Sequence, residues 1–312
     1  MFATLTLNPA IDTTLFIEGN LRINSVRKVK EEKNRPGGKG INVAKVIATN
    51  GCKVIAGGIL GEGEAPWFEC ELRKKGIECN FMKVPYKTRE NIMVSDDNGD
   101  EIKLNKPGYP ELQFDFPRLR RYCFGLAKKV DIIILSGSLP VRFPDRTYAV
   151  LIRLFHEAGK IVVLDTSGLP FLMGLREKPE IIKPNMQEFK ECCKSLFSQN
   201  KINLKDAMRS MAANHEVVIV SDGEHGAYFC NSSTFFKAKA PEVLSVDTTG
   251  AGDALLGQFC CDYFPARKLT KDVVAMAVAA GSASVELKNT FSLSVDRVKK
   301  LVRQVKVAEI ES

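Results

Sequence analysis

The pattern that most constrains the fold is an alternation of short, continuously apolar segments with longer segments of helical periodicity. The strand-like runs lie at 2–7, 53–59, 131–135, 161–164 and 217–220. The helical patterns lie at 41–48, 64–75, 112–129, 145–158, 186–197 and 204–213. Apolar strands separated by helices are typical of a parallel sheet whose two faces are both covered. We therefore predict an α/β fold with a doubly wound, mainly parallel sheet and helices on both faces.

Three further segments interrupt this alternation. Residues 12–36 hold short β-like pieces rich in charge, and 78–84 and 91–95 are also β-like. We predict that segments 12–36 and 78–106 form a small β-sheet lid on a single domain spanning 1–312. Such a lid would exclude water from a reaction site. Phe229 and the Phe235-Phe236 pair predict an antiparallel edge, and helices follow it through Leu301.

Composition indicates a globular protein that works in a reducing compartment. The 312 residues are 45% hydrophobic and 26% charged, which is ordinary for a soluble domain with a large core. No apolar run approaches the roughly 20 residues that span a bilayer, and the first residues do not resemble a signal peptide. The 9 cysteines lack a CxxC spacing and only 3 histidines accompany them, which disfavours zinc and favours free thiols in the cytoplasm.

The formal net charge of +8 favours anionic partners. A run of basic residues lies between Arg22 and Lys39, but no aromatic side chains interleave it as a nucleic-acid stacking surface requires. We therefore expect phosphorylated metabolites as partners, with neither nucleic acid nor membrane.

The segment Asp247-Thr248-Thr249-Gly250-Ala251-Gly252-Asp253 carries the strongest chemical signal. The small residues Gly250, Ala251 and Gly252 open an apolar helix, and the free amides of a helix start attract anions. A carboxylate at Asp253 would be repelled by a bound phosphate unless it accepts a proton from an attacking hydroxyl. The segment thus indicates phosphoryl transfer to an alcohol, although a tight turn with an acidic cap would show the same letters. It is not a dinucleotide fingerprint, because Leu255 stands where a small residue is needed.

Polar residues follow each predicted strand. In an open parallel sheet the ligand crevice lies beyond the carboxyl ends of the strands. The residues that follow those ends are Asn8, Asp12, Ser136, Ser138, Asp165, Lys183, Asn185, Glu188, Ser221, Gly223 and Gly226. Together with Asp253 they predict a pocket for an anion and a sugar.

Two motifs bring the chain close to a known family. They are Gly37-Gly38-Lys39-Gly40-x-Asn42-x-Ala44 near the start and the Asp247–Asp253 segment near the end. With these motifs the chain resembles the ribokinase-like carbohydrate kinase family over essentially its whole length. Further segments are similar to the sugar-phosphate kinase branch of that family: Thr6–Asp12, Thr88–Ile92, Asn105–Gly108, Ser136–Pro140, Asp165–Gly168 and Ile182–Asn185.

The resemblance implies a role for each matching position. Asp253 would be the general base, beside an anion hole of Gly250, Ala251 and Gly252 amides. The residues implied to contact substrate are Asp12, Gly38, Lys39 and Asn42 at the sugar hydroxyls, with Arg89, Lys103 and Ser138 at its phosphate. Those implied at the nucleotide are Lys183, Asn185, Glu188, Ser221, Gly223 and Gly226. Magnesium would lie near Asn185 and Glu188, with no direct metal ligand assigned.

The resemblance also implies a reaction. It is the ATP- and magnesium-dependent phosphorylation of a ketohexose phosphate, with fructose 1-phosphate to fructose 1,6-bisphosphate as the first expectation. Tagatose-6-phosphate kinase and 6-phosphofructokinase activities stay open, as does a non-enzymatic sugar-phosphate sensor. The planar Arg89 guanidinium would suit a phosphate dianion, and Arg22 or Arg27 is expected as a second phosphate ligand. A homodimer joined through the lid is implied as well.

Overall fold

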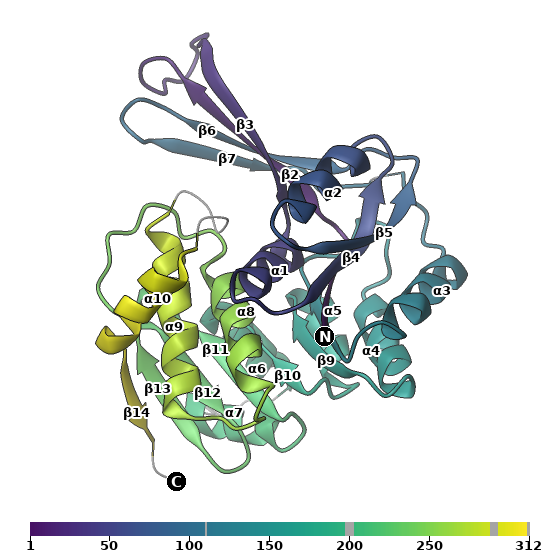
Figure 1. Cartoon of the computed structure of the whole chain (residues 1–312), viewed down its shortest axis with the longest axis vertical. Helices are drawn as coiled ribbons and strands as arrows, with labels where there is room; N and C mark the ends of the chain where they lie inside the picture. Colours follow the sequence, from purple (N-terminus) through teal and green to yellow (C-terminus); the bar gives the residue numbers. More distant parts are fainter. Residues whose placement is uncertain (110, 197–202, 288–292, 311–312) are drawn as a thin grey trace.

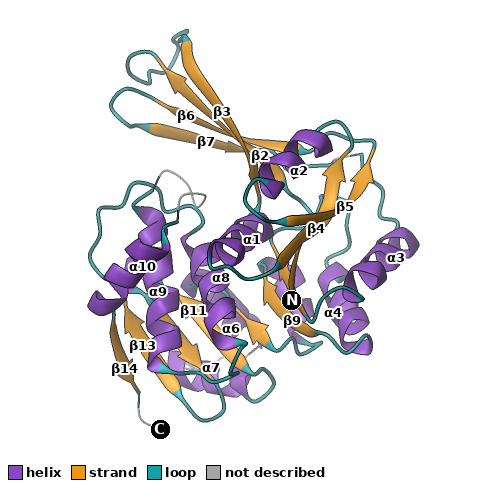
Figure 2. Cartoon of the chain, viewed as in Figure 1, coloured by secondary structure: helices purple, strands orange, loops and turns teal. Residues whose placement is uncertain are grey.

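Two separate β-sheets organise the chain (Figures 1 and 2). The computed structural model describes residues 1–109, 111–196, 203–287 and 293–310. A 10-stranded sheet runs in the order β14-β13-β12-β11-β10-β9-β8-β1-β4-β5, and a 4-stranded sheet in the order β3-β2-β6-β7. No helix among these residues is both long and apolar enough to cross a membrane.

The large sheet is parallel over most of its width. Its parallel strands are β1 (Phe2–Thr6), β4 (Val54–Gly61), β5 (Glu78–Val84), β8 (Ile132–Ser136), β9 (Ile161–Asp165), β10 (Ile181–Ile182) and β11 (Val217–Ser221). Three antiparallel strands extend one edge: β12 (Ala227–Cys230), β13 (Phe235–Lys239) and β14 (Lys306–Glu309). The predicted antiparallel edge is confirmed, and β14 adds a strand that the sequence pattern did not indicate.

Helices cover both faces of this sheet, as predicted (Figure 2). One face carries α1 (Lys39–Thr49), α2 (Ala65–Arg73), α8 (Ala251–Tyr263) and α9 (Lys271–Val285), and α10 (Val295–Leu301) packs on α9. The other face carries α3 (Phe116–Ala127), α4 (Thr147–Glu157), α5 (Gly168–Leu175), α6 (Met186–Leu196) and α7 (Leu204–Ala212). Strand β8 shows why both faces are covered: Ile133 and Leu135 enter one core, and Ile132 and Ile134 the other.

Most predicted helices are present within one turn of their expected bounds. Helix α5 was not predicted, because eight residues starting at a glycine and containing Pro170 give little periodic signal. The predicted helix at 186–197 ends at Leu196, and residue 197 lies outside the described residues.

The small sheet projects from the body of the molecule beside the start of α1 (Figure 1). It consists of β2 (Ala10–Ile17), β3 (Val29–Gly37), β6 (Arg89–Ser95) and β7 (Glu101–Asn105). The prediction that 78–84 belongs to it is wrong, because β5 pairs in parallel with β4 at the edge of the large sheet. An edge strand is half exposed to solvent, so its mixed polarity resembles that of a lid strand.

Candidate active site

One cavity of about 930 Å³ gathers almost all the predicted site residues. It is lined by Asp12, Gly38, Lys39, Asn42, Arg89, Lys103, Lys183, Asn185, Glu188, Ser221, Gly223, Gly226, Gly250, Ala251, Gly252 and Asp253. These residues come from the small sheet, the start of α1, the carboxyl edge of the large sheet and the start of α8. Ser138 does not line it; its Oγ instead accepts a hydrogen bond of 3.2 Å from Asn8 Nδ2.

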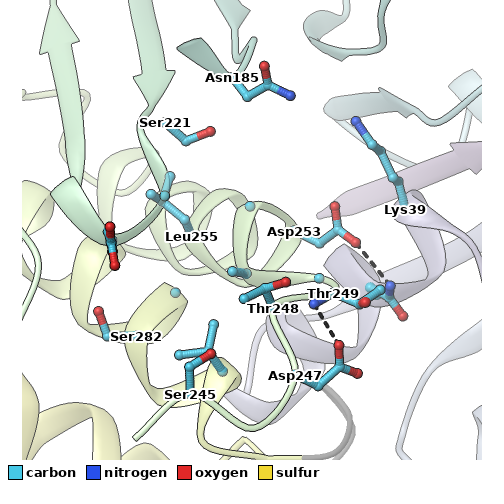
Figure 3. Close-up of a pocket in the computed structure, with 18 of the residues that line it drawn as sticks. Lys39, Asn185, Ser221, Ser245, Asp247, Thr248, Thr249, Asp253, Leu255 and Ser282 are labelled. Carbon is cyan, nitrogen blue, oxygen red and sulfur yellow. Dashed lines mark hydrogen bonds between the residues drawn. The ribbon is translucent and has the colours of Figure 1, made fainter. Parts of the chain in front are cut away.

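Asp253 lies buried in the first turn of α8, facing the cavity (Figure 3). Its Oδ2 accepts a hydrogen bond of 2.9 Å from Asn42 Nδ2 on α1. Burial and the nearby charge of Asp165 raise the pKa of Asp253 to about 6, against the opposing effects of Lys39 and the Asn42 hydrogen bond. A carboxyl group with such a pKa is ionised at neutral pH and can accept a proton there.

The start of α8 is shaped as a site for an anion. Gly250 caps the helix with a φ of 84°, a left-handed conformation that side chains other than glycine rarely adopt. A Cβ on Gly252 would lie 3.2 Å from Lys183 Nζ, so a side chain there would crowd the ammonium. The start of the helix thus offers free amides to the cavity, and the Lys183 side chain lies beside them. Both attract negative charge.

Asp165 at the end of β9 fixes the cations of this region. Its Oδ1 lies 3.2 Å from Lys183 Nζ and 3.4 Å from Lys39 Nζ, and its Oδ2 accepts a hydrogen bond from Ser136 Oγ. Burial acts to raise the Asp165 pKa, but Lys183 and Lys39 outweigh it and hold that pKa below its ordinary value. The charge of Asp165 in turn raises the pKa of Lys39. Lys39 is therefore held as an ammonium group at the cavity wall, and the ion pair with Asp165 places Lys183 Nζ near it.

A polar row crosses the small sheet on its cavity side. Register places Arg35 of β3 opposite Asp12, Asp12 opposite Asn91 of β6, and Asn91 opposite Asn105 of β7. All four residues line the cavity. Asn91 Nδ2 donates to Asp12 Oδ1 over 2.8 Å, while burial raises the pKa of Asp12.

Sequence reasoning did not assign Arg35, Asn91 or Asn105 to the site, although Asn91 and Asn105 each belonged to a recognised motif. Strand alternation alone could not have found them, because the pairing of β2 with β3 and β6 is a tertiary feature. Arg22 and Arg27, one of which was expected as a second phosphate ligand, do not line the cavity.

Two cations of the small sheet are tied to other parts of the chain. Arg89 donates from Nε to the carbonyls of Asn8 and Pro9, and from Nη1 to the carbonyl of Lys106. Burial lowers the pKa of Arg89, and the charge of Asp12 opposes that effect. Lys103 Nζ lies 3.0 Å from Asp247 Oδ1, so it bridges β7 to the loop that leads into α8.

The part of the cavity at the carboxyl ends of β10 and β11 combines the start of α6 with two glycines. Asn185 and Glu188 exchange hydrogen bonds between side chain and backbone at the start of α6. Gly223 and Gly226 follow β11, and a Cβ on Gly226 would lie 2.0 Å from the Ala238 carbonyl oxygen. Asn185 and Ser221 face the space beyond Asp253 (Figure 3).

Among the described residues, no group of three or more His, Cys, Asp or Glu side chains could hold a metal ion. The Glu188 carboxylate, with the Asn185 side-chain amide beside it, suits Mg²⁺ that keeps most of its water and binds substrate phosphates. The nine cysteines are all free thiols.

Comparison with protein families identifies the kind of protein. Residues 5–296 match the family described as pfkB family carbohydrate kinase, which is most of the chain. The chain belongs to this family. This kinase is therefore a phosphotransferase that acts on an alcohol group of a sugar phosphate, with ATP as co-substrate.

Two curated relatives match over nearly their full length. Tagatose-6-phosphate kinase of Staphylococcus epidermidis is 28% identical over 313 residues, covering 99% of this kinase and 100% of that protein. 1-Phosphofructokinase of Borreliella burgdorferi is 31% identical over 312 residues, covering 99% of each.

Solved structures share the fold. Phosphofructokinase-2 of Escherichia coli, solved in complex with potassium, is 25% identical with a TM-score of 0.85 and covers 97% of this kinase and 98% of that chain. Ribokinase of Thermotoga maritima is 21% identical with a TM-score of 0.73, over 97% and 99% of the two chains. The ribokinase-like fold expected from the sequence is therefore confirmed.

Proposed function

We propose that this kinase transfers the γ-phosphoryl group of ATP to a primary hydroxyl of a ketohexose phosphate, with fructose 1-phosphate as its acceptor. The product would then be fructose 1,6-bisphosphate. The observation that carries the proposal is Asp253 itself: a buried carboxylate, held by Asn42, at a helix start that favours phosphate. A sensor would gain nothing from a proton acceptor beside its anion site.

Asp253 acts as the general base in this proposal. It orients the acceptor hydroxyl, which forms a bond to the γ-phosphorus as the bond from that phosphorus to the β,γ-bridging oxygen breaks. ADP leaves, and the hydroxyl proton passes to Asp253. Such transfers depend mainly on placement and on charge stabilisation. Lys39, Lys183 and the amides of 250–252 supply positive potential where the transferred group carries negative charge.

Magnesium would be bound by the nucleotide phosphates, with Glu188 and Asn185 nearby. A bound Mg²⁺ neutralises phosphate charge. The protein itself holds Glu188 in place. Its Oε2 accepts from the backbone N–H of Asn185, and its Oε1 lies 4.0 Å from Lys39 Nζ.

The small sheet serves as the sugar-phosphate side of the site in this proposal. Asp12 and Asn91 offer oxygens and an amide to sugar hydroxyls, and Arg89 supplies charge for the phosphate already on the substrate. The 31% identical relative named 1-phosphofructokinase supports fructose 1-phosphate as acceptor, whereas the 28% identical relative acts on tagatose 6-phosphate by name.

We further propose that two copies associate through the small sheet, which would then act as a lid that excludes water. Ile102 and Leu104 alternate along β7 with the cavity residues Lys103 and Asn105, and about half of each apolar side chain is exposed, as is Val29. Phosphofructokinase-2 of Escherichia coli has been solved in a tetrameric form.

Equilibrium sedimentation of the full chain should give twice the monomer mass. Replacing both Ile102 and Leu104 by Ser should reduce the mass to that of the monomer. A wild-type monomer at micromolar concentration would contradict the proposal.

Acceptor choice is tested by comparing kcat/KM for fructose 1-phosphate, fructose 6-phosphate and tagatose 6-phosphate at fixed ATP. ADP release in a coupled assay gives the rates. We expect kcat/KM for fructose 1-phosphate to exceed that for either competitor about tenfold or more. The phosphate of the other two sugars is attached to a different carbon, so it would lie differently relative to Arg89. A higher value for either competitor would assign that sugar instead and leave the family membership untouched.

The base role is tested by Asp253→Asn, which keeps the shape of the side chain and removes its basicity. We expect kcat to fall about 10²–10⁴-fold with little change in sugar-phosphate affinity. In the wild type, kcat should decline as pH falls through about 6, where Asp253 becomes protonated. The variant should lose that decline. Unaltered turnover in Asp253→Asn would exclude Asp253 as the base.

The phosphate contact is tested by Arg89→Ala. Charge-assisted hydrogen bonds are worth about 1.5–3 kcal/mol, so KM for the sugar phosphate should rise about 10–100-fold while KM for ATP stays the same. The matched control is Arg22→Ala, which removes the same charge from an exposed position away from the cavity. An effect confined to ATP, or an equal effect of Arg22→Ala, would show that Arg89 does not bind the acceptor's phosphate.

A further inference from the structure

Lys45 is a buried cation for which the proposed mechanism has no role so far. It lies on α1, one turn after Asn42, and only 3% of it is exposed. Its Nζ donates to the carbonyl of Pro36 over 2.7 Å and to Asn42 Oδ1 over 3.0 Å. Asn42 Nδ2 then donates to Asp253 Oδ2 over 2.9 Å. A continuous path of hydrogen bonds therefore joins the end of β3 to Asp253.

The Asn42 amide can bind its two neighbours in two opposite orientations. With Nδ2 toward Asp253, it donates a hydrogen bond that favours the carboxylate. With Oδ1 toward Asp253, it could bind only a protonated carboxyl group. Lys45 decides between them, because its N–H groups require an acceptor, and Oδ1 is the acceptor that Asn42 offers.

The direction of this path is fixed by the ammonium form of Lys45, which has three N–H donors and no acceptor. Burial lowers the pKa of Lys45 well below its ordinary value, and the charges of Asp12 and Asp253 oppose that effect. An uncharged amine would carry a lone pair that could accept from Asn42 Nδ2, whereas the ammonium group can bind Asn42 only through Oδ1. The other charged groups that act on Lys45 and Asp253 are Arg35, Lys75, Lys39, Lys183 and Asp165.

We infer that Lys45 is a positioning residue for phosphoryl transfer: it fixes the orientation of the Asn42 amide and thereby keeps Asp253 in the proton-accepting form. This inference rests on the proposed base role of Asp253, but not on which sugar phosphate is the acceptor. Asp12 on β2 interacts electrostatically with the same lysine. Lys45 therefore interacts with both a proposed sugar contact and the proposed base.

The decisive variant is Lys45→Met, which fills the same volume without an N–H donor. Its kcat should be measured from pH 5 to 9 with ATP and whichever sugar phosphate has the highest kcat/KM. We expect the acid-side midpoint to rise by about one pH unit above that of the wild type, the effect of losing one hydrogen bond to the carboxylate. At pH 6 kcat should then be several-fold lower, and at pH 8 it should recover most of the wild-type value.

The control variant Lys45→Arg keeps both charge and donors, and its midpoint should stay near that of the wild type. Asn42→Ala should raise the midpoint as Lys45→Met does, and the double variant should show no further rise, because both changes break one path. A structural role alone would lower kcat equally at every pH. Such a uniform loss, or additive shifts in the double variant, would overturn the inference.

Two checks keep the result interpretable. If Lys45→Met does not fold, as judged by thermal unfolding, Lys45→Leu takes its place, since it likewise has no N–H donor for Asn42 and should raise the midpoint too. Asn42→Ala alone also decides, because an unchanged midpoint there would remove the path from Lys45 to Asp253. Failure of the base role itself would appear separately, as full activity in Asp253→Asn.

Discussion

The ion cluster at Asp165 is the interaction on which the rest of the site depends. A fully buried carboxylate is costly unless it is paired, and Asp165 is paired with Lys183 and Lys39 and accepts from Ser136. These partners come from β8, α1 and the segment after β10, so the cluster joins elements that are far apart in the sequence. It also places the side chains of Lys39 and Lys183 near Asp253 and the start of α8, where the proposed mechanism puts the transferred phosphoryl group.

The same buried charges explain why Asp253 is suited to accept a proton. A carboxylate so close to Asp165 is disfavoured by burial and by like charge, and its pKa rises to about 6. Asn42 opposes that rise by donating to it, and Lys39 by its charge. Lys45 connects the small sheet to Asn42, because it donates both to the carbonyl of Pro36 at the end of β3 and to Asn42 Oδ1. The end of β3 and the start of α8 are thus joined by a chain of hydrogen bonds.

Much of this could be predicted from the sequence, because the informative features are local. The apolar strands and amphipathic helices predicted the parallel sheet, and the 247–253 segment predicts an anion site and its acid within seven residues. Features that depend on register across strands were not accessible. Arg35 and Asn105 line the cavity because their strands pair with β2 and β6. Residues 78–84 belong to the large sheet because they pair in parallel with β4. Ser138 matches a motif, yet it lies against Asn8 instead of the cavity, because that contact is set by tertiary packing.

The most direct test of the account is a crystal structure of this kinase with a non-hydrolysable ATP analogue and its preferred sugar phosphate. We expect an Asp253 carboxylate oxygen about 2.6–3.2 Å from the acceptor hydroxyl, with the amides of 250–252 around the γ-phosphate. An acceptor hydroxyl far from Asp253, or a γ-phosphate bound away from the start of α8, would contradict it.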